Sequence, residues 1–131
     1  MTPDALVDLC LSLPQAVETF PFGEETSVFK TSGNGKIFAL TALAGDPLTV
    51  SLKCDPEESR ALREEFPRWI TPGYHLNKKH WITIVLNGEV PDELARQLLR
   101  DSHALVRPRV PRDRGVRQVS RRAGRLGDRQ R

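Results

Sequence analysis

The sequence has few of the features that mark membrane, secreted or disulfide-bonded proteins. None of its apolar runs approaches the roughly 20 residues that a membrane helix requires. The first residues carry Asp4 and Asp8 and no basic segment, so they do not resemble a secretion signal. Cys10 and Cys54 belong to no Cys-x-x-Cys pair, and we expect them to be buried, reduced thiols. We therefore expect a cytoplasmic protein with no membrane partner.

The sequence also lacks the common motifs of nucleotide, metal and nucleophilic sites. Beside Gly35-Lys36, a P-loop would need a glycine where Lys30 stands and a Ser or Thr where Ile37 stands. There is no Gly-x-Ser-x-Gly motif for a nucleophilic serine. His75 and His80 are five residues apart and lack the spacing and companion ligands of a zinc site. These absences predict a protein that is not an enzyme and that needs no metal and no cofactor.

The positive charge of the sequence is concentrated at its C-terminal end. Residues 107–131 contain ten arginines against Asp113 and Asp128, which gives this segment a net charge of +8. Residues 1–106 contain ten basic and 15 acidic side chains, which gives a net charge of −5. The composition therefore predicts a folded domain over residues 1–106, followed by an Arg-rich extension over residues 107–131.

Three segments with a proline near a capping residue predict the starts of helices. Thr2–Asp4 and Asp55–Glu58 place a capping side chain before proline and acidic residues, and Pro91–Glu93 begins a third helix. The apolar residues that follow each start recur at helical spacing. The expected helices cover about residues 3–13, 56–66 and 92–106.

Alternating polarity predicts an antiparallel sheet with one packed face. In the segment Leu48–Cys54 every second residue is apolar, and the residues between them are Thr, Ser and Lys. Such a sheet has helices on a single side. The expected strands cover about residues 16–20, 27–31, 36–43, 48–54 and 81–86. The predicted fold is a two-layer α+β sandwich with the element order α-β-β-β-β-α-β-α.

The segment Pro72–Trp81, P-G-Y-H-L-N-K-K-H-W, has the highest density of groups able to bind a ligand. If the isoleucines that follow Trp81 pack inward, Trp81 lies on the polar face of the sheet with Lys53, and Lys78 and Lys79 lie at its edge. Lysines beside an aromatic ring and hydroxyls are suited to a phosphate backbone. The alternative is that this segment only fastens a loop, that the loop or the C-terminal extension covers Trp81, and that the lysines are simply solvated.

The Arg-rich extension contains a second candidate contact. Val116, Val119, Ala123 and Leu126 have helical spacing, and arginines flank them. Such a helix would lie along nucleic-acid phosphates or dock on the acidic domain. The alternative is an extension without regular structure.

Three motifs together resemble those of the MmcQ/YjbR family of small bacterial proteins, also called DUF419. They are P-F-G-E-E-T-S-V-F-K with G-K-I-F-A-L, then S-L-K-C-D-P-E, and then P-G-Y-H-L-N-K-K-H-W followed by L-N-G-E-V-P-D, and the resemblance covers about residues 5–106. It implies a frataxin-like (CyaY-like) fold and a DNA-binding role, with no established catalytic residue, metal or cofactor. Two features depart from the family pattern: His103 stands where similar proteins usually have tyrosine, and the Arg-rich extension lies outside the shared domain.

These observations lead to a hypothesis of a non-enzymatic module that contacts double-stranded DNA. In it, lysines bind phosphates, Trp81 stacks on bases, and the extension supplies a second contact or a homodimer interface. The expected contact residues are Lys36, Lys53, Lys78, Lys79, His80, Trp81, Arg117, Arg121 and Arg122.

Two alternatives to DNA binding stay open. The first is a protein–protein or small-ligand binding module in which the Pro72–Trp81 segment is structural. The second, an enzyme that acts through Cys54 or His80, is weaker because the alternation places the thiol on the packed face.

Overall fold

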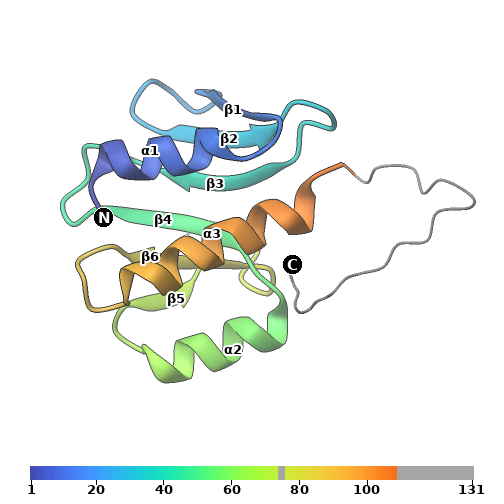
Figure 1. Cartoon of the computed structure of the whole chain (residues 1–131). Helices are drawn as coiled ribbons and strands as arrows, with labels where there is room; N and C mark the ends of the chain where they lie inside the picture. Colours follow the sequence, from blue (N-terminus) through green and yellow to red (C-terminus); the bar gives the residue numbers. More distant parts are fainter. Residues whose placement is uncertain (74–75, 109–131) are drawn as a thin grey trace, which may run out of the picture.

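The computed structural model describes residues 1–73 and 76–108 of the chain. Three helices and six strands follow one another in these ranges (Figure 1). In chain order they are α1 (Pro3–Ser12), β1 (Ala16–Thr19), β2 (Ser27–Thr31), β3 (Ile37–Thr41), β4 (Thr49–Lys53), α2 (Pro56–Glu65), β5 (Ile70–Pro72), β6 (Trp81–Val85) and α3 (Asp92–Val106). The expected contact residues Arg117, Arg121 and Arg122, and the expected helix around them, lie outside the described residues.

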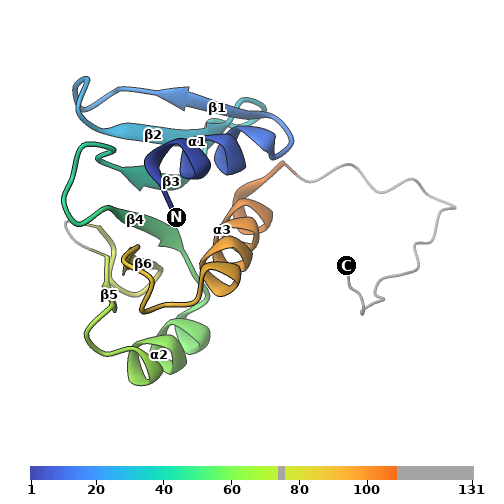
Figure 2. The same cartoon turned by 60° about the vertical axis from the view of Figure 1, so that its left-hand side comes forward.

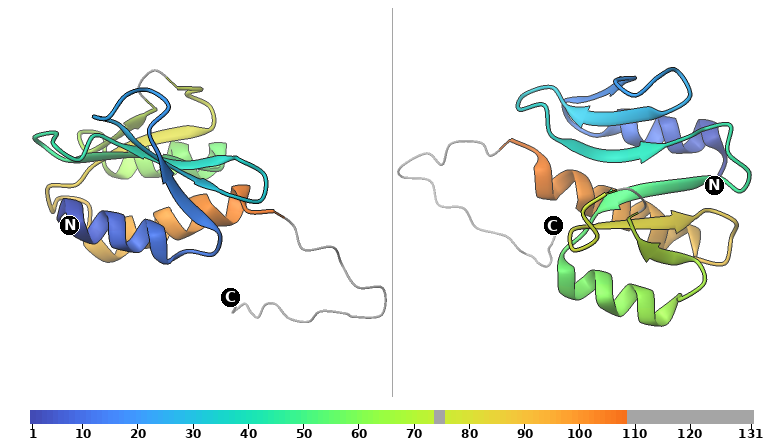
Figure 3. Two further views of the ribbon diagram at one scale, coloured as in Figure 1. Left: turned by 90° about the horizontal axis from the view of Figure 1, so that it is seen from above. Right: turned by 180° about the vertical axis from the view of Figure 1, so that it is seen from behind.

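The six strands form one antiparallel sheet in the order β1-β2-β3-β4-β6-β5. Helices α1 and α3 cover one face of this sheet, and α2 lies beside β5 (Figures 1 and 2). Seen from behind, the opposite face has no helix over it (Figure 3). We call this second face the open face. The predicted two-layer α+β sandwich with helices on one side is confirmed.

The helix starts form as their caps predict. The Thr2 hydroxyl accepts a hydrogen bond from the backbone N–H of Ala5 at 3.1 Å. The Asp55 carboxylate accepts from the N–H groups of Glu57 and Glu58 at 3.1 and 3.3 Å. These bonds satisfy backbone donors that the first turn of a helix leaves without a partner. No helix in the described ranges has the length and apolar character needed to cross a bilayer.

The core lies between the sheet and the helices, and a bulge in β3 enlarges it. Phe29 pairs with Ala39 but Lys30 pairs with Ile37, so Phe38 is an additional residue in β3. Phe38 is fully buried, and its ring meets the ring of His103 edge-on at 5.1 Å. The bulge thus directs the Phe38 ring toward α3, while the pairs on either side of it, Phe29–Ala39 and Lys30–Ile37, are kept.

Ser102 joins α3 to two strands at the centre of this core. Its buried hydroxyl donates to the carbonyl of Phe38 at 2.6 Å and accepts from the N–H of Lys53 at 2.8 Å. One turn of α3 is therefore held to both β3 and β4. Leu105 is apolar but 56% exposed, because Ser102, His103 and Val106 form the buried face at this end of α3.

The structure contains one strand more than the sequence predicted. The expected strands include none between residues 54 and 81, but Ile70–Pro72 forms β5 at the edge of the sheet. The Gly73 N–H donates to the carbonyl of Trp81 at 2.8 Å, which continues the pairing past the proline. A proline is tolerated there because an edge strand has one side without a partner.

Candidate nucleic-acid interface

Strands β4 and β6 bring the expected sheet residues together on the open face. Lys53 is paired with Trp81 and Ser51 with Thr83 across these strands. Directly paired residues of antiparallel strands point to the same side of the sheet. The buried residues between them, such as Leu52, point toward the helices. The grouping of Lys53, Ser51 and Trp81 on one face therefore agrees with the alternation in the sequence.

Lys30 belongs to the same face, although it is not among the contact residues expected from the sequence. Val28 pairs with Leu40, and Leu40 pairs with Ser51, so alternate residues of β2 point to the open side. Lys30, two residues after Val28, is half-buried there. It lies level with Lys53 and two strands away, which corresponds to about 10 Å between Cα atoms. Phe29 and Thr31, the neighbours of Lys30 along the strand, are buried toward the helices, which agrees with Lys30 pointing to the open side.

The Trp81 ring is held between Lys53 and the loop that precedes β6. The Lys53 ammonium lies 5.9 Å from the centroid of the ring, within the range of a cation–π contact. On the loop side, a Cβ added to Gly73 would lie 2.6 Å from the Cβ of Trp81 and 3.3 Å from that of Leu76. Only glycine fits against the tryptophan at this distance. Trp81 is consequently half-buried, and part of its ring is covered.

The loop between β5 and β6 is fastened by its own polar groups. The Lys78 ammonium donates to the carbonyl of Gly73 at 3.3 Å. The Asn77 side chain accepts from the N–H of Lys79 at 2.9 Å, and the Asn77 carbonyl accepts from the N–H of His80 at 3.1 Å. Part of the Pro72–Trp81 segment is thus structural, while the side chains of Lys78 and Lys79 are exposed. Tyr74 and His75 lie outside the described residues.

The remaining expected lysine, Lys36, is exposed in the turn between β2 and β3. Asn34 holds this turn, because its side-chain amide donates to the carbonyl of Val106 at 2.8 Å and its oxygen accepts from the Lys36 N–H at 3.0 Å. Four of the five lysines of the chain, Lys30, Lys53, Lys78 and Lys79, therefore lie on the open face or in the loop before β6, whereas Lys36 lies in the turn beside the C-terminal end of α3.

Carboxylates do not neutralise these lysines within the described ranges. There, the ion pairs are both made by Asp92, with the N-terminal ammonium at 3.5 Å and with Arg96 at 2.7 Å. Glu24 and Glu25, in the loop after β1, are exposed. On the open face, the strand residues of β2 and β4 thus include Lys30 and Lys53 and no carboxylate, while Glu24 and Glu25 lie in the loop whose Phe22 and Thr26 line that face.

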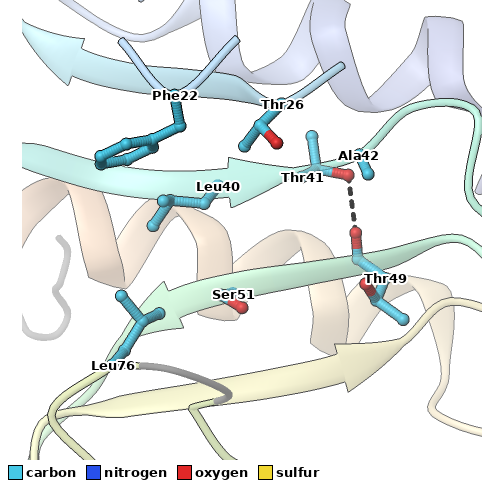
Figure 4. Close-up of a pocket in the computed structure, with 8 residues that line it drawn as sticks. All are labelled: Phe22, Thr26, Leu40, Thr41, Ala42, Thr49, Ser51 and Leu76. Carbon is cyan, nitrogen blue, oxygen red and sulfur yellow. Dashed lines mark hydrogen bonds between the residues drawn. The ribbon is translucent and has the colours of Figure 1, made fainter. Parts of the chain in front are cut away.

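A hollow of about 410 Å³ lies in the open face, which also carries Lys30 and Lys53 (Figure 4). Leu40 forms its floor, and Phe22 and Leu76 approach from the loops on either side. Its polar lining comes from hydroxyls, including those of Thr26, Thr49 and Ser51. Val28 is fully buried although it points to this same face.

The cysteine chemistry considered from the sequence has no support in the geometry. Burial, with the nearby Glu58 carboxylate, raises the pKa of the Cys54 thiol to about 12, so the thiol is protonated at neutral pH. Burial likewise raises the pKa of Cys10 to about 12. Burial and the charge of Asp101 raise the pKa of Glu58. In the described ranges, no group of three or more His, Cys, Asp or Glu side chains is placed to hold a metal ion.

The chain is similar to several known proteins over most of its length. It is 44% identical to the uncharacterized protein YbdF of Escherichia coli O157:H7 over 99 residues, which cover 75% of this chain and 78% of YbdF. It is 30% identical to the uncharacterized protein YjbR of Escherichia coli K12 over 103 residues, which cover 79% of this chain and 85% of YjbR.

Solved structures show the same fold. The DUF419 protein DR2400 of Deinococcus radiodurans superposes with a TM-score of 0.76 at 51% identity, over 79% of this chain and 77% of that one. A protein from Pseudomonas syringae superposes with a TM-score of 0.70 at 30% identity, over 82% of this chain and all of that one. The sequence model of the YjbR family matches residues 11–105. The chain therefore belongs to the YjbR family, also called MmcQ/YjbR or DUF419.

Proposed function

We propose that this YjbR-family protein binds double-stranded DNA through the open face of its sheet and catalyses no reaction. Lys30 and Lys53 bind backbone phosphates, Lys78 and Lys79 extend the contact at the rim, and Lys36 adds a contact from the turn between β2 and β3. Charge attraction of this kind supplies most of the affinity in non-specific DNA binding.

The observation that carries the proposal is the separation of charge between the two sides of the domain. Residues 1–106 have a net charge of −5, yet ten of their 15 acidic residues belong to the three helices or to the Asp55 cap. Lys30 and Lys53 lie on the open face and Lys78 and Lys79 in the loop before β6, and no described carboxylate pairs with any of them. A local field of one sign can attract a polyanion to a protein whose overall charge opposes it.

The Arg-rich extension is proposed as a second contact. Its +8 charge adds attraction for the same polyanion, and the arginines expected to contribute are Arg117, Arg121 and Arg122. A binding role without catalysis is supported by the protonated state of Cys54, the thiol considered as a nucleophile.

Salt titration with a duplex of mixed sequence tests the proposal. Affinity of the full chain, measured by fluorescence anisotropy, is expected to fall linearly with salt on a log–log plot. Lys30→Gln and Lys53→Gln each lower the slope by roughly 0.9, and the combined Arg117→Gln, Arg121→Gln and Arg122→Gln variant lowers it by up to roughly 2.7.

Arg60→Gln is the matched control, because it removes one exposed positive charge from α2, which lies beside β5 and contributes no residue to the proposed contact surface. It is expected to leave the slope unchanged. Absence of binding at low salt would reject DNA as the partner. An equal loss of slope in Arg60→Gln and Lys53→Gln would reject the open face as the contact surface.

A further inference from the structure

The hollow in the open face has properties that phosphate binding does not require. Its volume of about 410 Å³ falls in the lower part of the range of roughly 300–1,000 Å³ that is typical of small-molecule pockets. Leu40, Phe22 and Leu76 give it an apolar floor and walls (Figure 4). Phosphates are strongly hydrated and gain nothing from such walls, so the hollow suits a flat, partly apolar group.

Hydroxyl groups that line the hollow can form hydrogen bonds with a ligand. Within the described ranges, the hydroxyls of Thr26 and Thr49 make no hydrogen bond to another residue, while the Ser51 hydroxyl lies 2.9 Å from that of Thr83. A hydroxyl both donates and accepts, so it can pair with either kind of polar atom on the edge of a base. This lining would accept different bases with little preference among them.

The position of the hollow connects it to the lysines. Ser51 in its wall and Lys53 are two residues apart on the same side of β4, which places their Cα atoms about 7 Å apart. A group that fills the hollow and carries a phosphate would bring that phosphate to the Lys53 ammonium. Phe22, 68% exposed at the rim, presents a ring on which a base can stack.

From this arrangement we infer that the hollow receives one unpaired base of a nucleic-acid strand while Lys53 holds its phosphate. The inference rests on the proposed function, because it uses the same face and the same lysine. It adds a preference: DNA with unpaired bases binds more tightly than a fully paired duplex, whose bases cannot enter the hollow.

Three probes of equal length separate the base from the phosphates: an oligothymidylate strand, an abasic strand and a fully paired duplex. Stacking and burial of a base predict that the full chain binds oligothymidylate about five- to a hundredfold more tightly than the abasic strand. Phe22→Ala and Ala42→Leu, which fills the hollow from an exposed position, are each expected to weaken oligothymidylate binding about tenfold and leave duplex binding unchanged.

Leu11→Ala, at an exposed leucine of α1 on the far side, is the matched control and changes neither affinity. Equal binding of the oligothymidylate and abasic strands overturns the inference, and so does unchanged oligothymidylate binding by Phe22→Ala. In either case, salt-dependent binding of the duplex leaves the proposed function standing. Failure of every probe to bind at low salt removes the proposed function and the inference with it.

Free thymidine monophosphate distinguishes a strand site from a mononucleotide site. It is expected not to displace the oligothymidylate at equal concentration, because it has a single phosphate to contribute. Displacement at equal concentration would assign the hollow to a free nucleotide and overturn the inference.

Discussion

The two faces of the sheet are made by the same strands but have opposite compositions. Toward the helices, β4 and β6 present Val50, Leu52, Ile82 and Ile84, which are almost completely buried. On the open side the same strands present hydroxyls, Lys53 and a half-buried tryptophan. The comparison shows how one period-two alternation separates the residues that stabilise the domain from those available to a partner.

Lysines and arginines are divided between different parts of the domain. Lys30, Lys53, Lys78 and Lys79 lie on the open face or in the loop before β6, whereas the five arginines of residues 1–106 lie in or next to α2 and α3. Among these arginines Arg96 binds a carboxylate, that of Asp92 at 2.7 Å, and Arg63 donates to the neutral hydroxyl of Ser59 at 3.2 Å. The open face therefore carries its positive charge on lysines alone.

The largest expected effect comes from the packed face. Phe38→Ala removes a fully buried ring and leaves a cavity under α3, so the free energy of unfolding is expected to fall by about 3–5 kcal/mol. Leu40→Ala, two residues along β3 and on the open side, should cost clearly less because Leu40 is only half-buried. Urea denaturation measures both. Equal losses would contradict the division of the sheet into a stabilising and a binding face.

A smaller effect is expected at the junction of α3 with the strands. Ser102→Ala leaves the Phe38 carbonyl and the Lys53 N–H without their partner, which should cost about 1–3 kcal/mol in unfolding free energy. Thr49→Ala, a hydroxyl deletion on the open side, is the control and should change stability by less than about 0.5 kcal/mol. A Ser102→Ala domain as stable as the parent would show that the two hydrogen bonds are replaced by water or contribute nothing.

The smallest effect concerns the pH dependence of stability. Because the pKa of Cys54 is raised to about 12 in the folded state, its stabilising contribution is full below the ordinary thiol pKa of 9.0 and is lost as the pH rises toward 12. The unfolding free energy attributable to Cys54 should fall by about 1 kcal/mol when the pH rises by one unit above the ordinary thiol pKa. Comparing urea curves of the parent and of Cys54→Ala isolates this change, since the other titrating groups are shared. A parallel pH dependence in the two proteins would show that the thiol is not protected by the fold.

The fold was predictable because its signals are local. The Thr2 and Asp55 caps and the alternation of Leu48–Cys54 depend on neighbouring residues alone, and the structure has the helices and strand that they predict. Strand β5 was missed because three residues ending in proline do not form a periodic pattern, and only its pairing with β6 makes it a strand.

The candidate site was partly predictable for the same reason. The placement of Lys53 and Trp81 on one face follows from alternation within single strands. Lys30 was missed because Val28 and Phe29 are adjacent apolar residues on opposite faces, so the side that Val28 and Lys30 share is fixed only by the pairing of Val28 with Leu40. The hollow was not predictable because Phe22 and Leu76, which both line it, come from two loops far apart in the sequence that only the folded sheet brings to one place.

The short β5 edge also bears on self-association. Exposed strand edges invite pairing with a second molecule, because their outer N–H and C=O groups have no partner. Here the edge has only three residues, Ile70–Pro72, and proline has no N–H to contribute to a further ladder. Continuous growth of the sheet on this side is thereby discouraged, and any strand added to the molecule would find the longer β1 edge, Ala16–Thr19, at the opposite end.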